Sequence, residues 1–131
     1  MEKYKILFLL TILLCISCGN NKISIKVGSA LISSPDNQIL RSLTLENDSL
    51  SFAYQILLKD GCLGLSSINL NRVNDAYVIT YGNSVIENKK FHLQPDAIYI
   101  ISNYSIPDAK SHALEFKTNP RGNVKSVKEV K

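Results

Sequence analysis

Residues 50–58 of the chain read LSFAYQILL, and this stretch decides the fold class. Large apolar side chains occupy every second position, at Leu50, Phe52, Tyr54, Ile56 and Leu58. Neighbouring side chains of a β-strand point to opposite faces, so this spacing places all five on one face. The stretch therefore predicts a nine-residue strand that turns one side towards a hydrophobic core.

The same alternation recurs on both sides of this stretch. It is found at Ile23, Ile25 and Val27, at Tyr77, Ile79 and Tyr81, and at Leu114, Phe116 and Thr118. No window after residue 22 has helical periodicity over three turns. Short strands divided by turn-forming residues predict an all-β fold, an antiparallel β-sandwich or a barrel. In residues 125–131 charged side chains alternate with Val127 and Val130, and this pattern predicts an edge strand.

Turn-forming residues separate the apolar runs. They lie at 34–37 (SPDN), 47–48 (ND), 60–61 (DG), 74–75 (ND), 82–83 (GN) and 120–123 (PRGN). Aspartates fall mostly in or near such stretches, as do Asp36, Asp48, Asp60, Asp75, Asp96 and Asp108. Asp favours turns because its side chain bonds to the local backbone. Turn chemistry thus explains these carboxylates without pairs for acid–base catalysis.

The first 17 residues have the three-part layout of a secretory signal peptide. A charged start with Lys3 and Lys5 precedes an apolar run of 11 residues from Ile6 to Ile16, and small residues follow. A helix that spans a bilayer needs about 20 residues, so this run is too short. We expect the segment to be removed, which leaves 114 of the 131 residues as one domain.

The residues Cys15-Ile16-Ser17-Cys18 resemble the lipobox of bacterial lipoproteins. In that family the last cysteine is diacylated on sulfur, the signal is cut just before it, and the new amine is acylated. Cys15 replaces the usual Leu, as in the looser lipoboxes of Bacteroidetes, whose Asn-, Lys- and Ile-rich composition this sequence also resembles. The resemblance implies an anchor on Cys18 of acyl chains such as palmitate, each worth about 0.8 kcal/mol per buried CH₂.

The residues that follow Cys18 bear on location. In lipoproteins, Gly rather than Asp at the position of Gly19 favours transport to the outer membrane. Surface-exported Bacteroidetes lipoproteins often carry an acidic cluster here, and residues 19–22 (GNNK) contain none. We expect an outer-membrane protein that faces the periplasm, with a lipidated tether at 18–22 and a β-sandwich domain at 23–131.

Residues 93–99 read LQPDAIY and have the form L-x-P-x-x-x-Y. They resemble the tyrosine corner of fibronectin type III and related immunoglobulin-like domains, where the tyrosine hydroxyl bonds back to the backbone between strands E and F. The resemblance implies an immunoglobulin-like sandwich, with Leu93, Pro95 and Tyr99 as structural residues. The strands that it implies are C, F and G, at residues 77–81, 98–103 and 113–118. The family's usual strand-B Trp is absent.

The mature chain would keep one free cysteine, Cys62, because Cys15 leaves with the signal and Cys18 is acylated. No intramolecular disulfide is then possible. Cys62 lies among apolar and glycine residues in GCLGL (61–65). We expect it to be a small buried core residue.

The sequence contains no recognisable motif for metal binding, nucleotide binding or catalysis. The two histidines, His92 and His112, form no H-x-x-x-H or H-x-H pair, and no C-x-x-C, P-loop or G-x-S-x-G motif occurs. The net charge of +4 falls to +3 without the signal and is scattered along the chain, which does not suggest nucleic-acid binding. We expect no metal, no cofactor and no enzymatic activity.

The composition and motifs favour a non-catalytic binding or scaffolding lipoprotein with an envelope protein or glycan as partner. Tyr104 and Asp108 follow the implied strand F, in the loop that often carries recognition in immunoglobulin-like domains. They are our candidate binding residues. An inhibitor or immunity protein is an alternative that predicts an exposed charged or aromatic patch. A small hydrolase is another, and it predicts converging titratable groups in a pocket.

Overall fold

The computed structural model describes residues 19–130, so the predicted signal peptide and Cys18 lie outside the described residues. Within this range the chain is all-β, as predicted, and its one helical element is the 3-10 turn η1 (Asn88–Lys90). The strands are β1 (Ser24–Ile25), β2 (Leu31–Ser33), β3 (Ser42–Asn47), β4 (Tyr54–Leu58), β5 (Ser67–Asn69), β6 (Tyr77–Tyr81), β7 (Ser84–Ile86), β8 (Ile98–Asn103), β9 (His112–Thr118) and β10 (Val124–Glu129). No helix in residues 19–130 is long and apolar enough to cross a bilayer.

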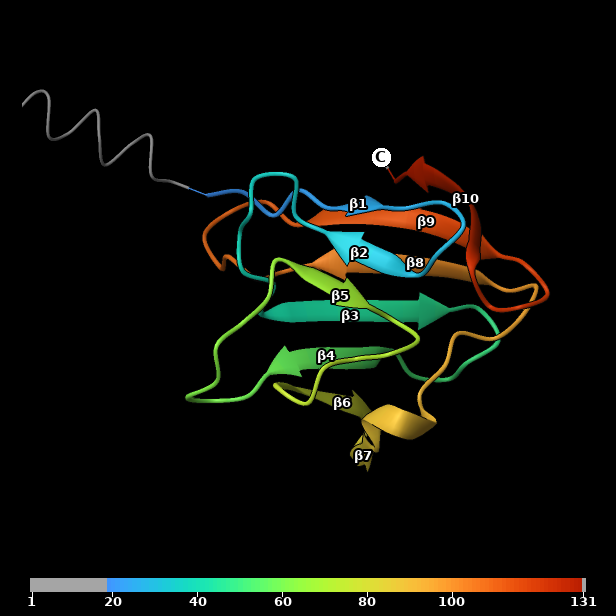
Figure 1. Cartoon of the computed structure of the whole chain (residues 1–131), viewed down its shortest axis with the longest axis horizontal. Helices are drawn as coiled ribbons and strands as arrows, with labels where there is room; N and C mark the ends of the chain where they lie inside the picture. The colour runs from blue at the N-terminus through green and yellow to red at the C-terminus, as the bar shows by residue number, and fades with distance from the viewer. Residues whose placement is uncertain (1–18, 131) are drawn as a thin grey trace, which may run out of the picture.

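The strands form two antiparallel sheets (Figure 1). The smaller sheet has the order β1-β2-β5, and the larger sheet has the order β10-β9-β8-β3-β4-β6-β7. In Figure 1 the smaller sheet lies in front of the part of the larger sheet that contains β9, β8 and β3. Buried side chains from both sheets belong to one hydrophobic core. The two layers are therefore stacked in a sandwich-like arrangement.

The predicted alternation builds this core. The inward side chains of two predicted strands are buried: Tyr77 and Ile79 in β6, and Leu114, Phe116 and Thr118 in β9. The ring of Tyr99, in β8, stacks on that of Phe116 with centroids 5.3 Å apart, a favourable separation for aromatic pairs. The edge strand predicted at residues 125–131 corresponds to β10, which lies at the edge of the larger sheet beside β9.

The strand predicted at residues 50–58 is shorter than the apolar pattern suggests. Only β4 (Tyr54–Leu58) is extended, and the chain turns before it. The side-chain oxygen of Asn47 accepts the N–H of Ser49 at 2.9 Å, and the Asn47 carbonyl oxygen accepts the N–H of Leu50 at 2.9 Å. This turn chemistry takes residues 50–53 out of the sheet. Phe52 is exposed and meets Tyr81 edge to face.

Strand β8 lies between β3 and β9 and does not pair with β6. In immunoglobulin-like domains strand C lies beside strand F in the C-F-G sheet, so the resemblance implies that residues 77–81 lie next to 98–103. In the structure β6 pairs with β4 and β7 instead. The β6–β7 hairpin turns at Gly82, where φ is +59°, a conformation that favours glycine. The assignment of residues 77–81 to strand C is therefore wrong.

Candidate functional site

The predicted structural residues Leu93, Pro95 and Tyr99 lie where the chain enters β8. The backbone N–H of Gln94 donates to Tyr99 Oη at 2.8 Å, and the Tyr99 ring is buried. This is the kind of bond that the tyrosine-corner resemblance implies. The segment differs in one respect, because it joins β7 to β8 within one sheet rather than crossing from one sheet to the other.

The predicted binding residues Tyr104 and Asp108 lie in the loop from β8 to β9, and both are exposed. Tyr104 is 50% exposed, and its backbone N–H donates to the carbonyl oxygen of Ser42 at 2.9 Å. The loop closes on itself where the N–H of Ala109 donates to Ile106 O at 3.2 Å. The loop is thus tied to the start of β3, while Tyr104 and Asp108 are exposed.

The segment predicted to be a tether is packed against this same loop. Asn21 is only 2% exposed. Its Nδ2 donates to the carbonyl oxygens of Ile106, Ala109 and Lys110 at 3.0, 3.3 and 3.3 Å, and its Oδ1 accepts the N–H of Ile106 at 2.8 Å. A buried amide needs such partners, and Asn21 finds them all in the domain. The chain is therefore already packed on the domain at Asn21, two residues before the predicted boundary at residue 23.

Packing extends to Gly19, the first described residue. A Cβ atom at Gly19 would lie 2.5 Å from Gln38 Oε1 and 2.7 Å from Ile106 Cδ1. A side chain there would require one of these neighbours to move, so glycine allows the close approach. The domain therefore comes within one residue of Cys18, which is bonded directly to Gly19.

A buried polar pair behind the loop joins it to β3. Asn103 Nδ2 donates to the carbonyl oxygen of Asn21 at 3.0 Å, while Asn103 Oδ1 accepts the N–H and the hydroxyl of Ser105. Ser105 Oγ in turn accepts the backbone N–H groups of Arg41 and Ser42 at 2.8 and 3.2 Å. The N-terminal segment, the β8–β9 loop and the start of β3 thus form one hydrogen-bonded unit.

The sequence pattern did not predict the hydrogen bonds that join Asn21, Asn103 and Ser105. Asn103-Tyr104-Ser105 carries a local signal, because Asn favours a bond to the backbone two residues later, and Asn103 Oδ1 makes this bond to Ser105 N. Asn21 carries no such signal, since its partners Ile106 to Lys110 are 85 to 89 positions away.

The loop between β4 and β5 lies at the same end of the molecule and carries Cys62. The prediction that Cys62 is buried is wrong, because the residue is exposed. Gly61, with φ +77°, turns the chain there. Leu63 follows and is 92% exposed, the highest value among the large hydrophobic side chains of residues 19–130. The N–H of Leu40 donates to Leu65 O at 2.8 Å, which ties the loop beside β3.

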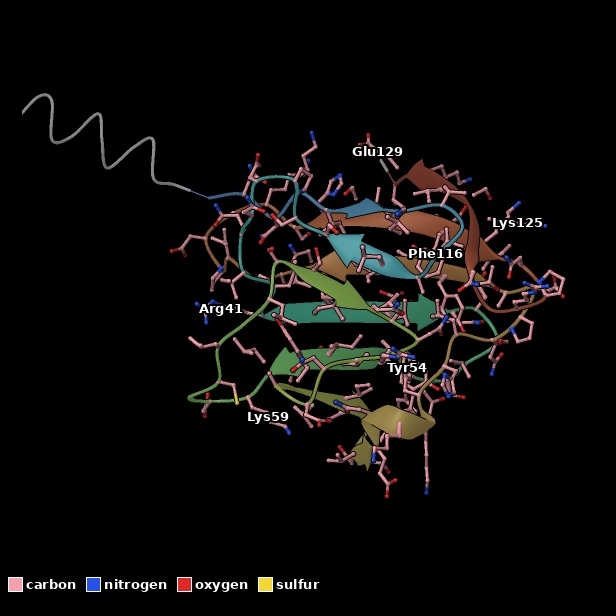
Figure 2. All side chains as sticks on the ribbon, viewed as in Figure 1. Arg41, Tyr54, Lys59, Phe116, Lys125 and Glu129 are labelled. Carbon is pink, nitrogen blue, oxygen red and sulfur yellow. The ribbon has the colours of Figure 1, made fainter. Side chains whose placement is uncertain are left out.

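We call this end of the molecule the anchor end, defined by residues 19–22, 34–41, 59–66 and 104–111. In Figure 1 these segments lie together at the left, where the described chain begins. Arg41 and Lys59, labelled in Figure 2, are at the same end. The anchor end is therefore the neighbourhood of the proposed acylation site.

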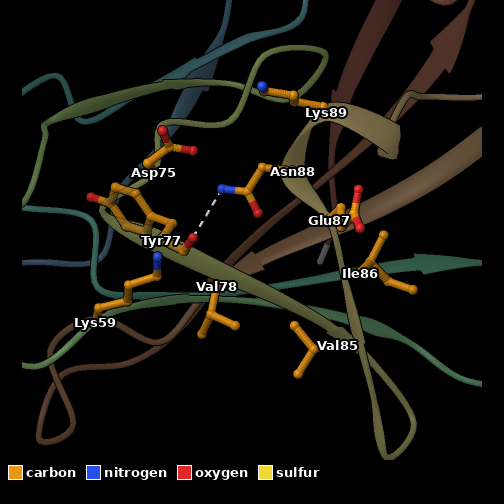
Figure 3. A pocket seen from close by; sticks show the side chains of 9 residues that line it. All are labelled: Lys59, Asp75, Tyr77, Val78, Val85, Ile86, Glu87, Asn88 and Lys89. Atoms are coloured by element: carbon orange, nitrogen blue, oxygen red, sulfur yellow. Dashed lines mark hydrogen bonds between the residues drawn. The ribbon is translucent and has the colours of Figure 1, made fainter.

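An open hollow of about 410 Å³ lies beside β6, β7 and η1 (Figure 3). Four of its lining residues are charged: Lys59, Asp75, Glu87 and Lys89. Tyr77 also lines it, but its hydroxyl donates to Leu40 O at 2.6 Å and accepts the N–H of Leu65 at 3.0 Å. Burial raises the pKa of Tyr77, so the phenol stays protonated and serves the structure.

A second hollow, of about 580 Å³, lies at the anchor end between residues 20–22, residues 110–113 and Val130. His112 is the titratable ring in its wall. Nδ1 of His112 accepts the N–H of Ile23 at 3.1 Å, so the neutral ring carries its proton on Nε2, which lies 3.7 Å from Glu129 Oε1. Because Nδ1 is occupied, His112 holds the N-terminal segment and has no free lone pair for a base.

Metal ligands do not gather in the part of the chain that the structure describes: no three His, Cys, Asp or Glu side chains there could hold an ion together. The other histidine, His92, is exposed near η1. Comparison of the chain with protein-family models, curated proteins and solved structures gives no match. Function is therefore inferred from the sequence and from the anchor end.

Proposed function

We propose that this chain is a bacterial envelope lipoprotein, acylated on Cys18, whose domain is a non-catalytic binding or scaffolding module. The observation that carries the proposal is the position of the lipobox relative to the fold. Gly19 is already packed on Gln38 and Ile106, and Asn21 is buried. A cut before Cys18 would leave these contacts intact and place the acyl chains beside the anchor end.

We assign the domain to the immunoglobulin-like β-sandwiches. Constant-type domains of that family hold strands A, B, E and D in one sheet and C, F and G in the other. Here β1, β2 and β5 match A, B and E, while the neighbours β3, β8 and β9 match C, F and G. Tyr99 then stands near the start of F, as the corner tyrosine does. In this assignment β4 follows C, β6 and β7 are an addition between E and F, and β10 follows G, while strand D has no counterpart in residues 19–130.

Two contacts support a binding role over the hydrolase alternative. Two of the titratable side chains in the hollows, His112 and Tyr77, are engaged with backbone groups. The exposed side chains of the anchor end include Tyr104 and Leu63, which suit contact with another surface. We place the protein at the outer membrane, facing the periplasm, with an envelope protein or glycan as partner.

Replacing the acylated residue tests this proposal. In cells that express Cys18→Ser, the protein should move from the membrane pellet to the soluble fraction, because the anchor is lost. Cys62→Ser, which removes the other mature thiol from an exposed position, should stay with the membranes and serves as the control. Equal pelleting of Cys18→Ser and wild type would contradict acylation at Cys18.

A further inference from the structure

Two loops of the anchor end carry exposed apolar side chains, the β4–β5 loop and the β8–β9 loop. These side chains are Leu63, Leu65 and Tyr104, which are 92%, 39% and 50% exposed. A single exposed apolar side chain is ordinary on a soluble domain. Several of them at the end next to the proposed acyl chains suggest membrane contact, because moving apolar surface from water into a nearby bilayer lowers the free energy.

The backbone holds the Cys62–Leu63 tip away from the core. Gly61 supplies a positive φ of 77° before the tip. After the tip, Gly64 lies so close to Ile39 that a Cβ atom would overlap the Ile39 side chain. The base of the loop is thus pressed against the domain while Leu63 projects from it.

The N-terminal segment leaves little freedom between anchor and domain. Asn21 is held by four hydrogen bonds of its side chain to the β8–β9 loop, and Gly19 is packed on Ile106. Gly19 is the residue bonded directly to Cys18, and consecutive Cα atoms are about 3.8 Å apart. Acyl chains on Cys18 would hold the whole anchor end at the membrane.

We propose that the anchor end is seated on the phospholipid bilayer that holds the acyl chains, with Leu63 and Tyr104 in its interfacial layer. This inference rests on the proposed acylation of Cys18. Tyrosine is favoured at the level of the lipid headgroups, where its ring meets apolar chains and its hydroxyl meets water. The anchor, Tyr104 and Leu63 then make three points of contact, which fix the orientation of the domain.

The charge balance at the anchor end indicates that apolar contacts, and not electrostatic attraction, stabilise its contact with the bilayer. Basic and acidic residues there nearly balance: Lys22, Arg41, Lys59 and Lys110 against Asp36, Asp60 and Asp108. A polybasic surface would depend on anionic lipid and weaken in salt. This surface should instead bind neutral and anionic bilayers alike, and salt should change the seating little.

The seating also determines which surface remains for a partner. Strands β3, β8 and β9 run from the anchor end to the opposite end of the larger sheet. The turns at Gly28, Asp48 and Gly122 lie at that opposite end. An envelope partner would then meet these turns instead of Tyr104 and Asp108, the binding residues expected from the sequence, because the seating turns Tyr104 towards lipid.

The test measures how close each end lies to lipid. The full acylated protein is placed in vesicles of phosphatidylethanolamine and phosphatidylglycerol, and the exposed thiol of Cys62 is labelled with a fluorophore that lipid-borne bromine quenches. The matched control carries the label at Val27→Cys in a Cys62→Ser background, since Val27 is 57% exposed beside Gly28. We expect quenching at position 62 to exceed that at position 27 at least about threefold.

A second comparison keeps the label on Cys62 and changes its neighbours. Leu63→Ser with Tyr104→Ser should lower the quenching to the level at position 27. Val85→Ser should leave it unchanged, because Val85 is 71% exposed but lies on β7. Vesicle flotation with equal quenching at both positions would overturn the seating and keep the anchor. Failure to float, with no acyl mass on the chain, would overturn the anchor and the seating together.

Discussion

Asn21 and Ile106 hold each other across 85 positions of sequence through two hydrogen bonds. Asn21 Nδ2 donates to Ile106 O at 3.0 Å, and the Ile106 N–H donates to Asn21 Oδ1 at 2.8 Å. The pair joins the first described residues to the β8–β9 loop. The N-terminal segment is therefore packed on the domain from Gly19 onward, and the proposed acyl anchor on Cys18 would have almost no free tether.

Asn21→Ala should destabilise the domain by about 2–3 kcal/mol, because it leaves the buried groups of the loop without partners. The measurement is urea unfolding of the unacylated Cys18→Ser protein with and without this change. Asn20→Ala is the control. Asn20 bonds only at the surface, to Asp36 and Lys22, so its loss should change the stability by no more than about 0.5 kcal/mol. Equal curves for the two variants would mean that residue 21 behaves as a tether.

Tyr99→Phe should destabilise the domain by about 1–3 kcal/mol, because the N–H of Gln94 loses the Tyr99 hydroxyl as its acceptor. Thermal melts of the soluble form measure the loss. Tyr104→Phe removes a hydroxyl from an exposed ring, so its melting temperature should equal that of the wild type. If Tyr99→Phe also melts with the wild type, the bond contributes nothing and the corner assignment loses its support.

Gly122→Ala should be more destabilising than Gly61→Ala, although both glycines have φ +77°. A Cβ atom at Gly122 would lie 2.7 Å from the carbonyl oxygen of Leu93, whereas one at Gly61 would meet nothing within 4 Å. The backbone strain of about 1 kcal/mol is common to both variants and cancels. In denaturant unfolding, the free energy of unfolding of Gly122→Ala should be lower than that of Gly61→Ala by at least about 1 kcal/mol. The reverse order would mean that the 119–123 turn does not pack on Leu93.

Alkaline pH should destabilise the domain through Tyr77 and Tyr54. Burial raises the pKa of both above the ordinary value of 10.0. The folded state then keeps its phenol protons to higher pH than the unfolded state does. The resulting contribution to stability is complete below about pH 10 and is lost as the pH rises through the folded pKa.

The slope of stability against pH isolates this effect. Urea unfolding across the range above about pH 10 should give a shallower fall of stability with pH for Tyr77→Phe than for wild type, because the variant lacks the buried phenol. The Tyr77→Phe protein should also be less stable at neutral pH, since the groups of Leu40 and Leu65 lose their partner. Parallel slopes would show that Tyr77 titrates as it does in the unfolded chain.

Period-two alternation was enough to find several strands, but it could not find their partners. Tyr77 and Ile79 alternate clearly and form β6, yet the neighbour of β8 is β3, whose Leu43 and Leu45 provide only two apolar positions. Leu50 and Phe52 continue the pattern of β4 but lie outside it, because the bonds of Asn47 end the preceding strand. Pairing and strand ends depend on contacts that a local pattern does not contain.

The anchor end was predicted only in part for the same reason. The exposure of Tyr104 and Asp108 follows from their place in a polar loop, and the sequence was sufficient for that. Asn21 stands in a polar run that looks like a linker, and its burial depends on a loop far along the chain. Cys62 has apolar neighbours, but Gly61 turns the chain so that the thiol faces water.

Intact-mass spectrometry of the protein extracted from membranes tests the central claim most directly. We expect a chain that begins at Cys18, 114 residues long, with added mass equal to a diacylglyceryl group and one amide-linked acyl chain. A membrane-derived chain that keeps residues 1–17, or one that begins at residue 18 without acyl mass, would contradict it.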